Sequence, residues 1–203
     1  MTRITRAQID ETLQAGDLII VHYLHGGVVA AGIQWWTHGH ASHVLNSLGG
    51  NSIVEEDIGG ASHGYLDTYL YGQCRLTIKR ILPHLSPVEK NRVVSYWLGL
   101  VGQPYGWRSV VASFFAVPIR RYLLPRFPGP ARFALRVVSR VVGHGQPDCS
   151  ASWVMGVRRP RPRLLAGYDA EDVTPETLLR DAKLLPVAVW DAPVLVKETH
   201  HHG

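Results

Sequence analysis

The chain has 203 residues, of which 46% are hydrophobic, and this is enough for a sizeable core, so we expect residues 1–203 to form a single domain. The N-terminus shows no basic segment followed by an apolar stretch, and no run approaches the ~18 uninterrupted apolar residues of a membrane span. From these features we expect neither a cleaved signal peptide nor a spanning helix, and we predict a cytoplasmic protein, unless it sits peripherally on a membrane or is exported without a cleaved signal.

Positive charge is concentrated in one part of the chain. Between residues 108 and 163 there are eleven arginines, no lysine and one acid, Asp148, so this segment carries +10 while the remainder carries −5. A basic face of this size suits an anionic partner such as a membrane surface or a cell-wall polymer, and we expect no specific nucleic acid. A solvated arginine face with no partner explains the pattern equally well.

The N-terminal part predicts a helix, a strand and a Gly-rich passage. A capping box at Thr5–Gln8 begins a short helix that ends at Gly16, and residues 17–21 form an apolar strand. The passage 26–40 contains two tryptophans, and we expect a short helix in its middle.

A hairpin follows. Residues 41–45 are strand-like, a Gly49-Gly50-Asn51 turn comes next, and residues 52–57 return as the second strand. His43 lies on the first strand and two carboxylates, Glu55 and Glu56, lie on the second. A base on one strand and a carboxylate on its neighbour is the arrangement that orients an imidazole for catalysis.

The middle of the chain predicts a loop, a strand and a helix. Residues 59–64 are rich in glycine and suggest a flexible loop, whereas 75–81 alternate as a strand. Ser86 and Pro87 begin a helix that should run to about Val101.

Residues 108–145 form a helical, Arg-rich insertion. Arg132, Arg136 and Arg140 recur every four residues beside apolar positions such as Phe133, which on a helix gives an arginine stripe flanking an apolar face. Such a helix can cover an active site, lie at a membrane interface, or pack on the domain. Its position before Cys149 favours an active-site cover or a substrate-recognition element.

Cys149 stands at a predicted helix start. Pro147 ends the preceding segment, Asp148 is a good N-cap, and an apolar helix should run to a stop at Gly156. Backbone N–H groups and the helix dipole at such a position lower the pKa of a thiol and favour the nucleophilic thiolate. The alternative is a small buried hydrophobic residue, which is what most free cysteines are.

The remaining histidines and the second cysteine add no cofactor site. His38, His40 and His43 are close in sequence but match no zinc signature, so we expect no metal and no cofactor. A disulfide between Cys74 and Cys149 would consume the nucleophile, so both thiols are expected to be free and the compartment reducing.

After the Cys149 helix, residues 158–163 are too rich in proline for a helix and predict an extended basic loop. A short helix at 174–179 and a closing strand at 185–190 follow.

Six short motifs occur in a characteristic order. They are Gly16-Asp17, Ser42-His43-Val44, Ile53-Val54-Glu55, Gly102-Gln103-Pro104-Tyr105, Cys149-Ser150 and Thr174-Pro175. Together they resemble the permuted NlpC-type branch of the papain-like cysteine hydrolases, the YiiX-type proteins, over roughly residues 16–180. The resemblance implies an α+β, permuted papain-like fold, with a small antiparallel sheet packed on helices and a Cys/His/polar site at their junction. Ser150–Trp153 depart from the residues usual after the Cys-Ser pair, which bears on the substrate pocket.

The carboxylate that orients His43 depends on the hairpin register. A two-residue turn at Gly49-Gly50 places His43 opposite Glu56, whereas a looser or bulged turn places Glu55 on the face of the histidine. The resemblance favours Glu55.

These observations predict a cysteine peptidase or amidase that works through an acyl-enzyme. Cys149 attacks a carbonyl, assisted by its own backbone N–H at the oxyanion; His43 transfers the proton and Glu55 orients the imidazole. The substrate is a peptide or acyl compound, and the resemblance implies peptidoglycan-type peptides. Two alternatives remain: a lipid-directed thiol acyltransferase or phospholipase with the same triad, and a non-catalytic module that binds anionic polymer.

Overall fold

The computed structural model describes residues 2–23, 39–57, 59–71, 74–104, 119–142, 148–167, 170 and 173–191. Its strands and helices, in chain order, are β1 (Thr2–Arg3), α1 (Arg6–Thr12), β2 (Leu18–Tyr23), β3 (His43–Gly49), β4 (Ser52–Asp57), β5 (Gly60–Tyr65), α3 (Asp67–Leu70), β6 (Cys74–Ile81), α4 (Pro87–Leu98), the π-helix η1 (Ile119–Leu123), α6 (Pro128–Val142), α7 (Cys149–Arg158), α8 (Pro175–Arg180) and β7 (Leu184–Asp191).

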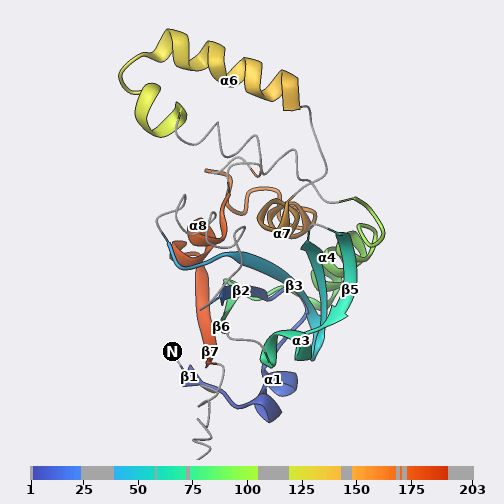
Figure 1. The fold of residues 1–203 in the computed structure, drawn as a ribbon. Coiled ribbons are helices and arrows are strands. Elements are labelled where there is room, and N and C mark those ends of the chain that lie inside the picture. The colour runs from blue at the N-terminus through green and yellow to red at the C-terminus, as the bar shows by residue number, and fades with distance from the viewer. Residues whose placement is uncertain are drawn as a thin grey trace, which may run out of the picture.

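A single seven-stranded sheet organises these elements, in the order β1-β7-β6-β2-β3-β4-β5 (Figure 1). All neighbouring strands are antiparallel except β1 and β7, which pair in parallel. The architecture is α+β, as the sequence predicts, although the sheet is larger than the small sheet expected. Within the described residues, no helix is long and apolar enough to cross a membrane.

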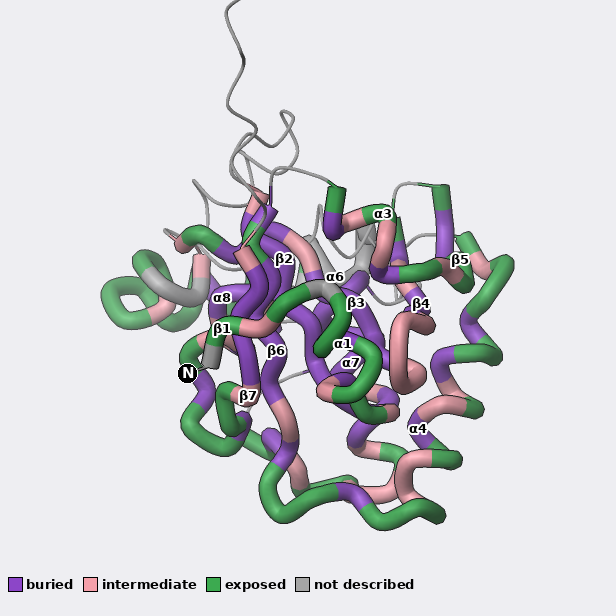
Figure 2. Tube along the Cα trace, turned by 90° about the horizontal axis from the view of Figure 1, so that it is seen from below, coloured by how far each residue is buried: buried purple, intermediate pink, exposed green. Residues whose placement is uncertain are grey.

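Each face of the sheet carries its own hydrophobic core, because successive side chains of a strand point to opposite faces. One core joins Val44 of β3 to Trp97 of α4 and Trp153 of α7. The other joins Leu45 of β3 to Ile9 of α1. Figure 2 shows the buried stretches of the chain running through the strands and α7. The central strands are therefore buried on both sides, and α7 covers the face to which Val44 points.

Local signals in the sequence place several helix starts correctly. Thr5 and Gln8 form the capping box at the start of α1, and Ser86 and Glu89 form the one at the start of α4. The α4 helix ends at Leu98, one turn before the predicted end. The closing strand and the short helix before it, α8, are also present where the sequence predicts them.

The loop predicted at residues 59–64 is wrong, because these residues form the edge strand β5. It pairs with β4 along its whole length, from Asp57 opposite Gly60 to Ser52 opposite Tyr65. β5 contains two glycines and few apolar residues, so its sequence shows no apolar alternation that would predict a strand. Gly60 has φ +119°, and a Cβ there would lie 2.7 Å from the Gln103 carbonyl oxygen.

The predicted stop of the Cys149 helix at Gly156 is also wrong, since α7 continues to Arg158. A Cβ at position 156 would lie 2.3 Å from the Trp97 indole nitrogen. Glycine is needed here because α4 and α7 approach closely, and not because the helix ends.

The basic stretch 158–163 is more ordered than the extended loop that the sequence predicts. Arg158 Nε donates to the Leu164 carbonyl oxygen at 3.0 Å, and Arg161 forms an ion pair with Glu89 at 2.7 Å. Arg159 lies over the Tyr96 ring, 4.8 Å from its centre. These arginines therefore contact the fold and are not a free basic tail.

Within the predicted insertion, α6 begins at Pro128, because proline is well tolerated at the first helical position. Figure 1 draws α6 and η1 beyond α7. The predictions for the Gly-rich passage up to His38, for Tyr105, for residues 108–118 and for 143–147 fall outside the described residues.

Candidate active site

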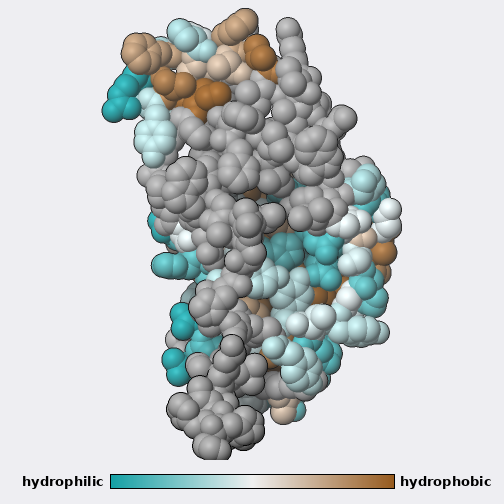
Figure 3. All heavy atoms as spheres, in the orientation of Figure 1, coloured by the Kyte–Doolittle hydropathy of each residue, from teal (hydrophilic) through white to brown (hydrophobic). Residues whose placement is uncertain are grey.

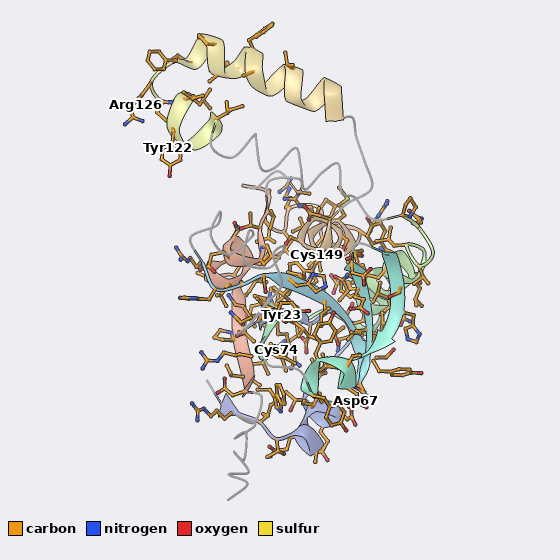
Figure 4. The ribbon with its side chains drawn as sticks, viewed as in Figure 1. Tyr23, Asp67, Cys74, Tyr122, Arg126 and Cys149 are labelled. Carbon is orange, nitrogen blue, oxygen red and sulfur yellow. The ribbon has the colours of Figure 1, made fainter. Side chains whose placement is uncertain are left out.

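Cys149 occupies the first position of α7, as predicted (Figure 4). The Asp148 carboxylate caps the helix by accepting hydrogen bonds from the backbone N–H groups of Ser150 at 3.0 Å and Ala151 at 2.8 Å. The N–H group of Cys149 itself donates to no acceptor among the described residues. The first turn of α7 therefore presents a thiol together with an available backbone donor.

The environment of the Cys149 thiol differs from the one that the sequence predicts. Burial raises the pKa of this thiol well above its ordinary value, and the nearby carboxylates of Asp148 and Glu56 raise it further. A hydrogen bond from the Val44 backbone N–H acts in the opposite direction on this pKa and does not outweigh burial. These shifts favour the neutral thiol and run against the preformed thiolate that the helix position predicts.

His43 is the first residue of β3, next to Val44. Because side chains alternate along a strand, the His43 ring lies on the same face as Leu45, whereas Val44 points toward α7. The ring stacks on Tyr69, with the ring centroids 6.5 Å apart. Among the described residues, no hydrogen bond joins His43 to Cys149 or to Glu55.

The His43 imidazole is neutral and has an unused nitrogen. Part of the residue is exposed, yet its Nε2 atom is buried and has no hydrogen-bond partner within the described part of the chain. Burial lowers the pKa of His43 to about 4, and the negative charge of Asp57 only partly opposes this. A neutral imidazole with an unpaired buried nitrogen is available as a base.

Glu55 lies on the same face as His43, as the bulged-turn alternative predicts. The register shifts between Ser47 and Gly49, and Leu45 pairs with Glu55. The Glu55 carboxylate accepts a hydrogen bond from the Tyr69 hydroxyl. Glu55 therefore reaches His43 through the Tyr69 ring and not by direct contact.

Glu56, the rival carboxylate, points to the opposite face and meets the nucleophile helix. The Ser152 hydroxyl donates to it at 2.7 Å, and the Asn46 amide donates to its two oxygens at 3.4 and 3.3 Å. Only 2% of Glu56 is exposed. Burial raises its pKa to about 8, while the bonds from Ser152 and Asn46 act against that shift.

A second carboxylate that the sequence pattern did not single out, Glu176, holds the segment before His43. Its Oε2 atom accepts hydrogen bonds from the backbone N–H groups of His40 at 3.2 Å and Ala41 at 3.4 Å. A Cβ at Gly39 would lie 2.0 Å from the same oxygen. The position directly after the Thr174-Pro175 motif was the only signal that pointed to this residue.

Cys74 lies in the core on the face of His43 and plays no part near Cys149. Its thiol donates to the Tyr69 carbonyl oxygen at 2.9 Å, and burial raises its pKa to about 11. Both cysteines are free. Within the described ranges, no group of three or more His, Cys, Asp or Glu side chains could hold a metal ion.

Comparisons with known proteins assign no family to the chain. No family model matches it, and no curated protein matches it. Among solved structures it is similar to the crystal structure of the metalloprotein YiiX from Escherichia coli O157:H7, with 17% sequence identity and a TM-score of 0.48 over 90% of this chain and 99% of that one.

Proposed function

We propose that the protein is a cysteine hydrolase with a permuted papain-like fold of the NlpC type, in which Cys149 is the nucleophile and His43 the base. One observation carries the proposal. The Cys149 thiol lies at the Val44 backbone N–H, and the adjacent residue, His43, keeps a buried ring nitrogen without a partner among the described residues. The nucleophile on α7 and the unused base are thus linked to consecutive residues of one strand, β3, although the His43 ring lies on the opposite face of the sheet from Cys149.

The two pKa shifts define how the pair works. Both groups are neutral at rest in this proposal, the Cys149 thiol and the His43 imidazole. His43 therefore removes the proton as Cys149 attacks the carbonyl carbon, and no preformed ion pair is needed. Because the His43 ring rests against Tyr69 on the other face of the sheet, this step requires a rearrangement at the start of β3 that brings the imidazole to α7. The N–H of Cys149, for which the described residues offer no acceptor, stabilises the oxyanion.

Collapse of the tetrahedral intermediate breaks the bond to the leaving group, which takes the proton from His43. The acyl group is then bound to the Cys149 sulfur as a thioester. Water attacks this thioester while His43 accepts a proton from it, and the thiol leaves with that proton. Glu55 acts as a positioning residue, because its bond to the Tyr69 hydroxyl fixes the ring against which His43 stacks.

The substrate is an amide or an ester, and peptides of the peptidoglycan type are the first candidates by resemblance. A second candidate is the acyl bond of a lipid. It is favoured by the exposed apolar side chains of α6, including Phe133, which is 70% exposed. Hydrolysis of a peptide and hydrolysis of a lipid acyl bond would use the same nucleophile, so one chemical test applies to both reactions.

Acylation by p-nitrophenyl acetate in a Cys74→Ser background tests the proposal. We expect an acetyl group on Cys149, located by peptide mapping and mass spectrometry, which disappears with time as water releases acetate. Cys149→Ala should abolish both the adduct and the burst of nitrophenol. Equal turnover in Cys149→Ala would contradict the proposal and favour a non-catalytic role.

A further inference from the structure

The segment formed by η1 and α6, residues 119–142, presents large apolar side chains to solvent. On α6, Phe133 is 70% and Val137 42% exposed, and these two residues lie one helical turn apart. Tyr122, Leu123 and Phe127 precede them and are 48%, 44% and 57% exposed. Figure 3 shows brown and tan spheres gathered over this part of the molecule.

The same segment is strongly basic. Residues 119–142 contain six arginines and neither an acid nor a lysine. Arg126 and Arg132 are exposed, and neither pairs with an acidic side chain in the part of the chain that the structure describes. Arg158 and Arg161, by contrast, bond to carbonyl oxygens and to Glu89 within the fold. Arg126 and Arg132 thus present positive charge to solvent beside the exposed apolar side chains of this segment.

The combination of charge and apolar surface identifies the partner. Arg132 precedes Phe133 on α6 and lies about 100° from it around the helix axis, so a basic side chain flanks the apolar pair Phe133 and Val137. An anionic polymer would be bound by the arginines alone, whereas exposed Leu123, Phe133 and Val137 gain free energy only where they leave water. A bilayer of anionic phospholipids satisfies both kinds of side chain.

The length of α6 determines whether it would cross a bilayer or lie on its surface. Its 15 residues span about 22 Å at ~1.5 Å per residue, which is shorter than the ~30 Å hydrocarbon core of a bilayer. A helix of this length lies in the interface plane and does not cross. We propose that η1 and α6 dock the protein on the surface of an anionic phospholipid bilayer, with Phe133 and Val137 in the interface and Arg126 and Arg132 at the phosphate groups.

Vesicle co-sedimentation tests this proposal directly and does not depend on the proposed hydrolase activity. Phosphatidylcholine vesicles are compared with vesicles that also contain phosphatidylglycerol. We expect at least about tenfold tighter binding to the anionic vesicles. Phe133→Ser should lower the partition coefficient at least about tenfold, and Arg132→Ala should lower it about fivefold.

Matched substitutions elsewhere on the surface serve as controls. Tyr71 is 71% exposed on the other side of the sheet, so Tyr71→Ser should leave vesicle binding unchanged, and so should Arg92→Ala on α4. All four side chains are exposed, and circular dichroism confirms that each variant is folded. Acylation of Cys149 by the soluble ester should be unchanged in all four variants, which separates this test from that of the proposed function.

Three results would overturn the proposal. The first is binding that does not distinguish anionic from neutral vesicles. The second is equal binding by Phe133→Ser and the unsubstituted protein. The third is binding that Arg132→Ala weakens and Phe133→Ser does not, since this would assign the segment to a soluble anionic polymer.

Discussion

The Ser152 hydroxyl on α7 donates a 2.7 Å hydrogen bond to the Glu56 carboxyl group on β4. This contact, with Asn46 of β3 as a third member, joins the nucleophile helix to the two strands that carry His43 and Glu55. The polar network lies inside the core on the face of Val44, one helical turn from Cys149. The position of the nucleophile therefore depends on a buried carboxyl group.

Replacing Glu56 by glutamine should change how stability depends on pH. The pKa of Glu56 is raised to about 8 in the folded protein, so the folded state keeps a proton that the unfolded state loses near its ordinary pKa. Its stabilising contribution is complete below pH 4.5 and is lost as the pH rises to 8, with a slope of at most about 1.4 kcal/mol per pH unit. Glu56→Gln should remove this loss in urea unfolding measured between about pH 4.5 and about pH 8.5.

Glu89 provides a control for the unfolding measurement, because its pKa is shifted in the opposite direction from that of Glu56. Arg161 lowers the pKa of Glu89 to about 2, so Glu89 contributes stability that is lost only as the pH falls below about 4.5. Glu89→Gln should therefore leave the slope between about pH 5 and about pH 8 unchanged. A pH dependence of Glu56→Gln identical to that of the unsubstituted protein would contradict the role of this carboxyl group.

Gly156→Ala should displace or destabilise the nucleophile helix. The added methyl group would overlap the Trp97 indole, whose Nε1 donates to the Ser152 carbonyl oxygen at 3.1 Å. We expect a loss of about 1–3 kcal/mol in the free energy of unfolding. Gly129→Ala on α6 is the matched control, because no atom lies within 4 Å of its added Cβ, and it should be neutral or slightly stabilising. Equal effects at the two glycines would refute the packing argument.

Glu176→Ala should slow acylation of Cys149 by freeing the segment that leads into His43. Two backbone N–H groups, those of His40 and Ala41, would lose their acceptor, at a cost of about 1–3 kcal/mol. Glu176→Gln keeps an acceptor oxygen and should restore much of the rate. Arg180→Ala removes only the partner of the other carboxylate oxygen and should have a smaller effect. If Glu176→Gln and Glu176→Ala acylated equally slowly, the hydrogen bonds from His40 and Ala41 to Glu176 would not be the cause of the slower acylation.

A double-mutant cycle tests whether Glu55 acts through Tyr69. Their hydrogen bond is the only link among the described residues from Glu55 toward the His43 ring. Glu55→Gln and Tyr69→Phe should each lower the acylation rate, and the double variant should be no slower than the slower single variant. Additive losses would show that the two residues act independently.

The sequence predicts much of the backbone, because capping boxes and alternating apolar residues are local signals. The starts of α1, α4 and α7 and the β3–β4 hairpin are where these signals place them. The sequence did not predict β5 because its glycines and small polar residues give no apolar alternation. The extension of α7 beyond Gly156 was missed because the reason for this glycine is Trp97, a residue distant in sequence.

The candidate site could be predicted in composition but not in its electrostatics. Cys149 at a helix start follows from a local pattern, whereas the choice of Glu55 over Glu56 on the face of His43 rested on the resemblance, because the turn left the hairpin register open. The raised pKa of the Cys149 thiol could not be predicted from a local pattern, because it arises from burial and from the nearby Glu56 carboxylate. Glu56 in turn faces α7 only because of the hairpin register. The anchor at Glu176 joins residues more than a hundred positions apart, and no periodicity reports such a contact.

The rate of Cys149 acylation by p-nitrophenyl acetate, measured against pH with and without His43→Ala in a Cys74→Ser background, tests the central claim most directly. With His43 as base, the rate should rise as a group of pKa about 4 loses its proton and then stay level through neutral pH. In His43→Ala the rate should be lower at about pH 6–7 and rise about tenfold per pH unit, because only the rare thiolate reacts. Identical profiles for the two proteins would contradict the claim that His43 takes the proton from Cys149.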